Sequence, residues 1–221
     1  MHPVRKLKAI AARLRFKNSK QYWERRYKNG GNSGKGSYGH LAEFKAKVIN
    51  DFIKKHKISY VAELGCGDGN QLAQIKAPNY LGLDVSERAI DICKEKFGYD
   101  KTKSFYLHNK GTHFHYHDLA LSLDVIFHLV EDDVFEEYMH YLLCLSNKYV
   151  IIYSSNTDKN DLIHAPHVKH RRFIEWIEKN RPEWKLQEVI KNKYPQESFA
   201  DFYIYKLEGE PKTKWEWVAA R

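Results

Sequence analysis

"VAELGCGDGNQL", residues 61–72, is the stretch that decides the fold of this chain. An apolar run ends at the carboxylate Glu63, and glycines follow at every second position, at Gly65, Gly67 and Gly69. Glycine tolerates positive φ and lets the backbone approach a ligand closely. The pattern therefore predicts a buried strand that leads into a ligand-binding turn at the carboxyl end of a parallel sheet.

Strand and helix patterns alternate along the rest of the 221 residues. We expect strands at 59–64, 79–85, 103–109, within 117–129, and at 148–155, 184–195 and 200–207. We expect helices at 3–16, 40–56, 70–75, 86–97, 131–145 and 168–181. This alternation predicts an α/β fold with a mostly parallel, seven-stranded sheet and helices on both faces. The last two strands should form an antiparallel pair at the sheet edge.

The first 39 residues differ in character from the remainder. Residues 3–16 form a basic amphipathic pattern, and residues 30–39 hold five glycines with aromatic residues on either side. Aromatic residues around a glycine-rich loop favour a lid that closes over a ligand. We therefore divide the chain into a basic helix and lid loop at 1–39, a ligand-binding domain at 40–208 and a tail at 209–221.

Positive charge is concentrated before the glycine turn. Residues 1–57 contain 16 of the 37 Lys and Arg residues but only 3 of the 28 Asp and Glu residues. Such a segment suits nucleic acid, an anionic membrane surface or a phosphorylated substrate, and a solvated helix face explains it equally well. The chain has no run of about 18 apolar residues and no signal-peptide pattern.

The cysteines favour a reduced compartment. Cys66, Cys93 and Cys144 are far apart and form neither a CxxC pair nor a zinc pattern. We therefore expect a cytoplasmic protein. Contact with the inner face of a membrane through the basic N-terminal helix is an additional expectation. The sequence predicts no particular oligomer.

The spacing and acidity of the turn select its ligand. A dinucleotide fingerprint would place a third glycine at position 70, which is Asn, and no Lys-Ser/Thr pair follows as in a phosphate-binding loop. Glu63 and Asp68 are unfavourable beside a pyrophosphate but suit a cation that carries an amino group. S-adenosylmethionine is such a ligand. Asp84, at the end of the next predicted strand, can accept hydrogen bonds from its ribose hydroxyls.

Two segments, ELGCGDGNQL (63–72) and YLGLDVSERAIDICKEKF (80–97), resemble the cofactor motifs of class I S-adenosylmethionine-dependent methyltransferases. The resemblance spans about residues 40–155 and implies a Rossmann-like fold with an N-terminal helical lid. It implies that the cofactor contacts Glu63, Gly65, Cys66, Gly67, Asp68, Gly69, Asp84, Val85, Ser122 and Leu123. The family's acid after the third strand is missing, so Asn109 or the backbone alone would take its place.

The flanking segments YWERRY (22–27) and HLVED (128–132), with the glycine-rich loop, are similar to methyltransferases encoded with bacterial capsule-polysaccharide genes. This resemblance implies O-methylation of a small or glycan-linked acceptor, with phosphorylated and phosphoramidate-bearing sugars included. It also implies that Tyr22 and Arg26 close over the cofactor, with Arg26 at its carboxylate.

Asp124 and His128 are the candidate catalytic residues. Methyl transfer to a hydroxyl needs a group that accepts a proton, and histidine has a suitable intrinsic pKa. The two residues are four apart, so they share a face if the turn after the strand is helical. The alternatives are a packed histidine that caps the next helix and an aspartate that contacts only the cofactor.

A basic segment after the fifth predicted strand supplies candidate substrate contacts. Together with the lid loop, it predicts that an anionic acceptor meets Tyr38, His167, His170, Arg171 and Arg172. Arginine binds phosphate and carboxylate groups in a bidentate manner, although a solvated helix start is the alternative. Histidines recur within 164–170 and 113–117, but no carboxylate completes the first set and a surface strand explains the second. We predict no metal site.

Two other functions remain open. The basic N-terminus favours an RNA methyltransferase, but residues 122–125 read SLDV where an amino-methylating enzyme has an NPPY-like tetrapeptide. No RNA-binding module is recognisable, so nucleic acid is not the expected partner. A module that binds the cofactor, or NAD, without turnover is the third alternative.

Overall fold

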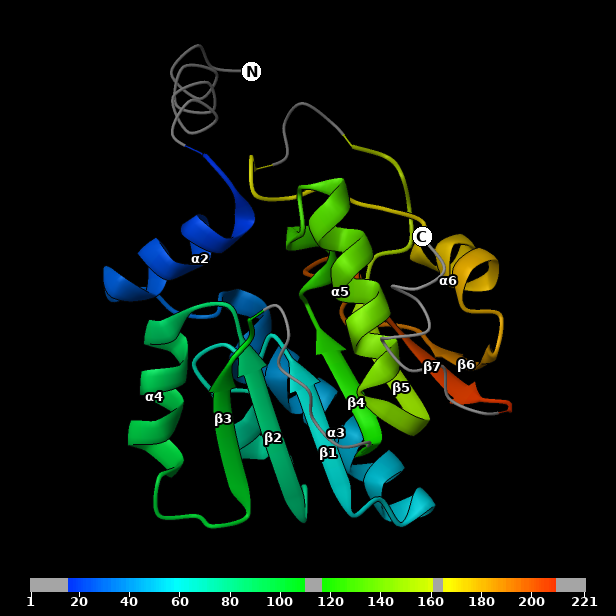
Figure 1. Cartoon of the computed structure of the whole chain (residues 1–221), viewed down its shortest axis with the longest axis horizontal. Coiled ribbons are helices and arrows are strands. Elements are labelled where there is room, and N and C mark those ends of the chain that lie inside the picture. The colour runs from blue at the N-terminus through cyan, green and yellow to red at the C-terminus, as the bar shows by residue number, and fades with distance from the viewer. Residues whose placement is uncertain (1–15, 110–116, 161–164, 210–221) are drawn as a thin grey trace.

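A seven-stranded sheet forms the centre of the computed structural model, which describes residues 16–109, 117–160 and 165–209. The strands are β1 (Tyr60–Leu64), β2 (Asn79–Asp84), β3 (Lys103–Leu107), β4 (His117–Leu123), β5 (Ser146–Ser154), β6 (Trp184–Ile190) and β7 (Asp201–Leu207). Their order in the sheet is β3-β2-β1-β4-β5-β7-β6. Figure 1 shows the strands side by side, with the carboxyl ends of β1, β2 and β4 at one edge.

The strand directions confirm the predicted α/β fold. β1 to β5 pair in parallel, whereas β7 runs antiparallel to both β5 and β6. The predicted antiparallel pair at the sheet edge is therefore β6 and β7. The chain proceeds from β1 to β2 and β3 on one side and then to β4 on the other. This reversal creates a crevice beyond the carboxyl ends of β1 and β4, where ligands bind in such sheets.

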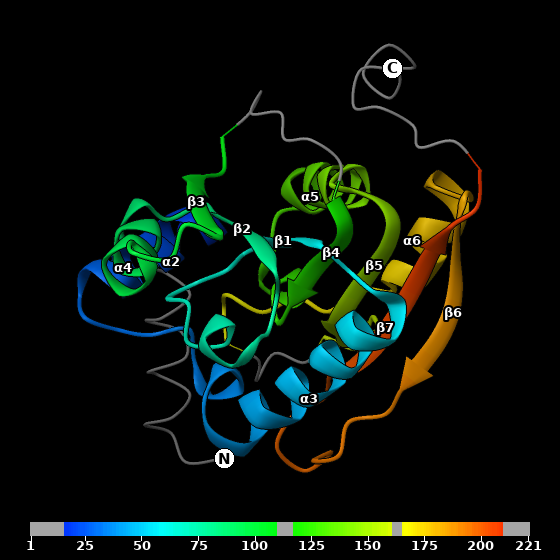
Figure 2. The ribbon, with the colours of Figure 1, turned by 90° about the horizontal axis from the view of Figure 1, so that it is seen from below.

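Helices cover both faces of the sheet. They are α2 (Ser19–Lys28), α3 (Gly39–His56), α4 (Glu87–Phe97), α5 (Asp132–Cys144) and α6 (Phe173–Asn180). Figures 1 and 2 show α5 and α6 on one face and α3 on the other, while α2 lies beyond the carboxyl ends of the strands. The position of α2 above the crevice makes it a lid.

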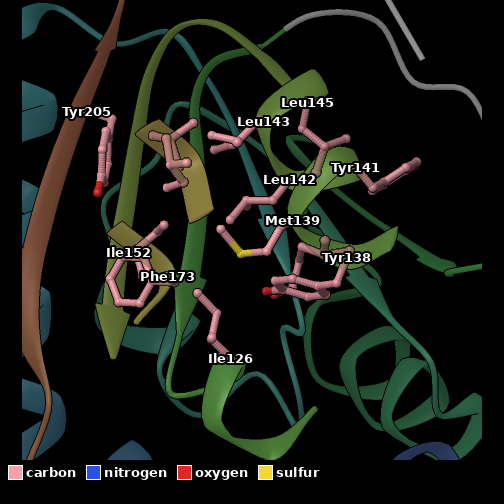
Figure 3. Close-up of a cluster of buried hydrophobic side chains, with 14 of the residues drawn as sticks. Ile126, Tyr138, Met139, Tyr141, Leu142, Leu143, Leu145, Ile152, Phe173 and Tyr205 are labelled. Carbon is pink, nitrogen blue, oxygen red and sulfur yellow. The ribbon is translucent and has the colours of Figure 1, made fainter. Parts of the chain in front are cut away.

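Alternate residues of each central strand face two separate apolar cores. Val61, Leu119 and Ile151 belong to the core under α3 and α4. Ala62, Ala120 and Ile152 belong to the opposite core with Met139 and Leu142 of α5, shown in Figure 3. Burial on both faces explains why the central strands read as nearly continuous apolar runs.

Four predicted elements differ from the structure, and one of them is the strand expected at 184–195, which ends at Ile190. The helix expected at 168–181 begins at Phe173, because the main-chain N–H groups of Lys169 and His170 bond to Phe127 O (2.8 Å) and Asn160 Oδ1 (2.7 Å) in an extended segment. The helix expected at 70–75 is only a 3₁₀ turn, η2 (Leu72–Gln74), and the lid loop contains another, η1 (Lys35–Ser37).

Several predicted features lie outside the described residues. They are the basic helix up to residue 15, the tail from residue 210, and His113, His115 and His164. Within the described ranges, none of the helices is both long enough and apolar enough to cross a membrane.

Candidate active site

A cavity lies between the carboxyl ends of β1, β2 and β4 and the lid helix α2. Of the residues predicted to form the site, those that line it are Glu63, Gly65, Cys66, Gly67, Asp84, Val85, Leu123, Asp124 and His128. Residues from segments far apart in the sequence therefore meet at one edge of the sheet. The sequence had placed them at strand ends and in the turns that follow, where neighbouring parallel strands bring side chains together.

The space and the backbone angles of the glycine turn leave no room for side chains at Gly65 and Gly67. Gly65 and Gly67 have φ values of 89° and 57°, which L-residues with side chains rarely adopt. A Cβ on Gly67 would lie 2.3 Å from Ser33 Oγ and 2.9 Å from Tyr27 Oη, and a Cβ on Gly65 would lie 2.5 Å from a methyl of Val125. The turn is thus packed between the lid and the loop that follows β4.

Three carboxyl groups face the cavity from three neighbouring strand ends. Glu63 and Asp84 are 2% and 7% exposed, and burial raises the pKa of Glu63 to about 7 and that of Asp84 to about 6. Asp124 lies at the end of β4. Among the described residues that line the cavity, only Lys20 carries an ammonium group. The cavity therefore favours a positively charged ligand.

Hydrogen bonds hold the two most buried acids in place. The Tyr80 hydroxyl donates to Glu63 Oε2 (2.5 Å). Asp84 accepts from the main-chain N–H of Gly67 and from that of Ser86, both at 2.9 Å. Asp84 thus joins the end of β2 to the glycine turn and fixes the position of each relative to the other.

The environment of His128 sets its protonation. Its Nδ1 lies 2.9 Å from the main-chain oxygen of His167, and because a carbonyl only accepts, Nδ1 carries the proton. Burial lowers the pKa of His128 to about 3, so the ring is neutral near pH 7. Nε2 therefore keeps a lone pair for accepting a proton, although the lowered pKa also makes the buried ring a weak base in the free protein. The Trp23 ring contacts the imidazole edge-on at a centroid distance of 4.9 Å.

Asp124 has an unusual backbone and a buried partner. Its φ is 60°, and its carboxylate accepts from Lys45 Nζ at 2.5 Å. The following turn is a 3₁₀ helix, η3 (Ile126–His128), so Asp124 and His128 do not share the α-helical face that their spacing suggested. Both nevertheless line the cavity.

The lid helix presents a different face from the one predicted. Ser19, Lys20, Trp23 and Tyr27 line the cavity. Tyr22 and Arg26 are not among the lining residues. Tyr22 stacks on the His167 ring at 4.1 Å, and Arg26 Nε donates to Asn32 O at 2.6 Å. The missed residues Trp23 and Tyr27 are spaced four apart within YWERRY, a signal that the sequence did contain.

Three other predicted cofactor residues support the cavity from outside. Asp68 Oδ2 accepts from Ser33 N (2.9 Å) and from the Tyr38 hydroxyl (2.7 Å), so it fastens the lid loop to the glycine turn. Ser122 is fully buried and accepts from the Tyr138 hydroxyl (2.7 Å). A Cβ on Gly69 would lie 2.7 Å from the ring of Phe97.

The basic residues predicted to bind substrate are engaged with the protein. His170 is buried, with Nδ1 2.6 Å from Ser155 Oγ. Arg171 donates to the main-chain oxygens of Leu129 and Val130. Arg172 forms ion pairs with Asp158 (3.1 Å) and Glu175 (2.9 Å). None of the three lines the cavity, and His167 reaches the site only through its contacts with Tyr22 and His128.

The end of β3 contributes a residue that the sequence did not suggest. His108 lines the cavity, and its main-chain N–H donates to Asp84 O at 2.7 Å. Asn109, the expected replacement for the missing acid, is not among the lining residues. In the described ranges, no group of three or more His, Cys, Asp or Glu side chains is arranged to hold a metal ion.

Solved methyltransferase structures share this fold. The N-methyltransferase NodS from Bradyrhizobium japonicum, in complex with S-adenosyl-L-homocysteine, is 12% identical with a TM-score of 0.67, over 87% of this chain and 100% of that chain. The magnesium protoporphyrin IX methyltransferase ChlM from Synechocystis, with bound S-adenosylmethionine, is 15% identical with a TM-score of 0.62, over 88% and 99%. An O-methyltransferase family protein from Burkholderia thailandensis is 12% identical with a TM-score of 0.57, over 78% and 57%.

The similarity is structural and not detectable as sequence relationship. No protein-family model and no curated protein matches the sequence. The structural matches confirm the predicted Rossmann-like fold of class I methyltransferases. Because these proteins differ in the kind of methyltransferase they are, their fold leaves the acceptor undetermined.

Proposed function

We propose that the chain is an S-adenosylmethionine-dependent methyltransferase that methylates a hydroxyl group. The observation that carries this proposal is the set of three carboxyl groups, Glu63, Asp84 and Asp124, around a side-chain-free turn at the switch point of a methyltransferase fold. Such a cavity suits a nucleoside with positive charge and is unfavourable for a pyrophosphate.

The residues present fit this cofactor. Asp84 would bind its ribose hydroxyls, and Asp124 and Glu63 would face its cationic methionine part. Gly65 and Gly67 let the backbone approach it closely. Val85 and His108 line the remaining wall near the end of β2 and β3. When bound, the cofactor supplies a methyl group activated by the positive charge on sulfur.

His128 is the proposed general base. Its neutral ring has Nε2 unprotonated, so it can accept the proton of an acceptor hydroxyl. The main-chain oxygen of His167 accepts from Nδ1 and stabilises the imidazolium that then forms. Trp23 and Tyr27 of the lid cover this part of the cavity and exclude water. Asp124 is less suited to proton transfer, because its Oδ2 is already engaged by Lys45 Nζ at 2.5 Å.

For the acceptor, we propose a small or glycan-linked hydroxyl compound of the kind used in surface-polysaccharide synthesis. Arg171 and Arg172 bond to other protein groups and do not line the cavity, so they do not offer an anionic acceptor a partner inside it. This supports an acceptor whose reacting end is uncharged. Lys20 is exposed and lines the cavity mouth. A phosphate or phosphoramidate group on the acceptor would therefore meet Lys20 and remain outside the carboxylate-lined interior.

Calorimetric titration with S-adenosylhomocysteine and, separately, with NAD tests the cofactor. We expect the first to bind and NAD to show no binding. Asp84→Asn should weaken S-adenosylhomocysteine binding by about tenfold to a hundredfold, because hydrogen bonds to a charged group are lost. The matched control is Asp91→Asn, at an exposed position of α4. Binding of NAD in place of S-adenosylhomocysteine would overturn the proposal.

A methyl-transfer assay with labelled S-adenosylmethionine tests the reaction. We expect label to reach hydroxyl-bearing sugars and sugar phosphates. Transfer to amines or to bulk RNA, with none to hydroxyl compounds, would contradict O-methylation while leaving the cofactor assignment intact.

A further inference from the structure

We propose that Lys45 is a positioning residue, which holds the Asp124 carboxylate in place at the edge of the cavity to meet the ammonium group of the cofactor. The inference rests on the cofactor proposed above. It assigns a role to a side chain that lies outside the cavity and that the sequence did not single out.

Lys45 occupies an exceptional position on α3. Its side chain is 0% exposed, whereas that of Lys47 on the same helix is 75% exposed and pairs with the exposed Asp51. Burying an ammonium group is costly unless a charged partner and good geometry compensate. Lys45 has Asp124 Oδ2 at 2.5 Å and the face of the Tyr153 ring at 5.3 Å. The buried ammonium is therefore compensated only while the Asp124 carboxylate is in place.

Asp124 is held from three directions. Its main-chain N–H donates to Tyr153 O (2.9 Å), which continues the pairing of β4 with β5. Its φ of 60° turns the chain sharply at the edge of the cavity. A Cβ on Gly36 of the lid loop would lie 2.8 Å from Asp124 Oδ2, so the lid backbone packs against the carboxylate. Its side chain remains 18% exposed, and it lines the cavity.

The charges around Asp124 explain why it needs Lys45. Glu63 on β1 and Asp84 on β2 face the same cavity, and Tyr153 on β5 also interacts with Asp124. Burial raises the pKa of Glu63 and the charges of Asp84 and Asp124 raise it further, whereas the charge of Lys45 lowers it. Without Lys45, the Asp124 carboxylate would face these acids with no ammonium group to hold it. It would then be free to turn away from the cofactor.

Titration with S-adenosylhomocysteine tests the role of Lys45. Lys45→Met should lower affinity by about tenfold to a hundredfold, because the Asp124 carboxylate is no longer held in place. Lys45→Arg should restore most of the affinity, because it keeps the charge. Lys47→Met, on the exposed face of the same helix, should leave affinity unchanged.

Two further variants separate positioning from a general packing role. Lys45→Gln keeps a donor for Asp124 without the charge, and it carries the test where Lys45→Met does not fold by circular dichroism. In an Asp124→Asn background, Lys45→Met should cause no further loss of affinity. An equal loss in both backgrounds, or a loss in Lys45→Arg as large as in Lys45→Met, would overturn the role of Lys45.

The same titrations distinguish the two proposals. Failure of the wild-type protein to bind S-adenosylhomocysteine would overturn the cofactor assignment and this inference together. Normal wild-type binding, with Lys45→Met also normal, would overturn only this inference.

Discussion

The Nδ1 atom of His128 lies 2.9 Å from the main-chain oxygen of His167. A backbone atom thus decides which nitrogen of the ring carries the proton, because the carbonyl can only accept. The choice leaves Nε2 as the basic nitrogen of a ring that lines the cavity. A side-chain partner could be removed by substitution, but this one is fixed by the path of the chain after β5.

His128→Ala should lower kcat by about a hundredfold to ten-thousandfold, as expected for the loss of a general base. The affinity for S-adenosylhomocysteine should change little, since the proposed cofactor contacts lie on other residues. His167→Ala is the control, because it keeps the main-chain oxygen and removes the ring that stacks on both Tyr22 and His128. Steady-state kinetics and calorimetry measure the two effects. Unfolding of His128→Ala by circular dichroism would instead indicate a packed, structural histidine.

Cofactor binding should strengthen as the pH rises. The pKa of Glu63 is about 7 and that of Asp84 about 6, both raised by burial, so these acids become fully charged only above neutrality. A cationic ligand binds the charged forms more tightly and releases protons as it binds. The affinity for S-adenosylmethionine should therefore increase from about pH 5 to about pH 8, and more steeply than for the uncharged-sulfur product. Calorimetry in buffers of different ionisation enthalpy counts the protons.

In the free protein, by contrast, the contribution of these two acids to stability should decrease as the pH rises. Their pKa values exceed the unfolded values of 4.5 and 3.8, so their contribution to stability is complete below those values. It is lost as the pH rises through 6 and 7. Glu63→Gln should therefore reduce the loss of stability at alkaline pH, as measured by urea unfolding. An affinity for S-adenosylmethionine that falls with pH would contradict the first expectation, and an equal loss of stability at alkaline pH in Glu63→Gln and the wild type would contradict the second.

Gly67→Ala should abolish cofactor binding while the protein stays folded. The φ of 57° disfavours a side chain, and the new Cβ would lie 2.3 Å from Ser33 Oγ. Ser33→Gly removes that atom, so the double variant should recover part of the binding. Tyr27 Oη, at 2.9 Å from the same Cβ, would keep the recovery incomplete. Equal binding by Gly67→Ala and the wild type would contradict the assignment of the turn.

Local patterns in the sequence were sufficient for the glycine turn and its acids. Glu63 and Asp84 end neighbouring strands, and parallel pairing alone brings strand ends together. The contacts of Arg171 could not be predicted in this way. It reaches Leu129 O, which is 42 residues upstream, so a cationic side chain that suggested a phosphate clamp instead braces a loop. Lys45 was missed for the opposite reason: it reads as an ordinary surface lysine, because nothing in the α3 pattern marks one lysine as buried.

The face of α2 that meets the cavity was also beyond the sequence. Its orientation depends on the Ser19 hydroxyl donating to Glu131 Oε2 at 2.6 Å and the Ser86 hydroxyl donating to Glu24 Oε2 at 2.5 Å. These partners are 112 and 62 residues apart in the chain. The helical period groups Tyr22 with Arg26 and Trp23 with Tyr27, but only docking decides between the pairs.

This docking leads to a last prediction about the lid. Trp23→Ala should weaken S-adenosylhomocysteine binding or raise the KM for the acceptor by about tenfold, because a large ring that lines the cavity is lost. Arg26→Met should change the cofactor affinity by less than about twofold, since its guanidinium bonds to Asn32 and Tyr22. Calorimetry with both variants makes the comparison. A larger loss of cofactor affinity in Arg26→Met than in Trp23→Ala would mean that α2 turns its other face to the cofactor on binding, as the sequence resemblance implied.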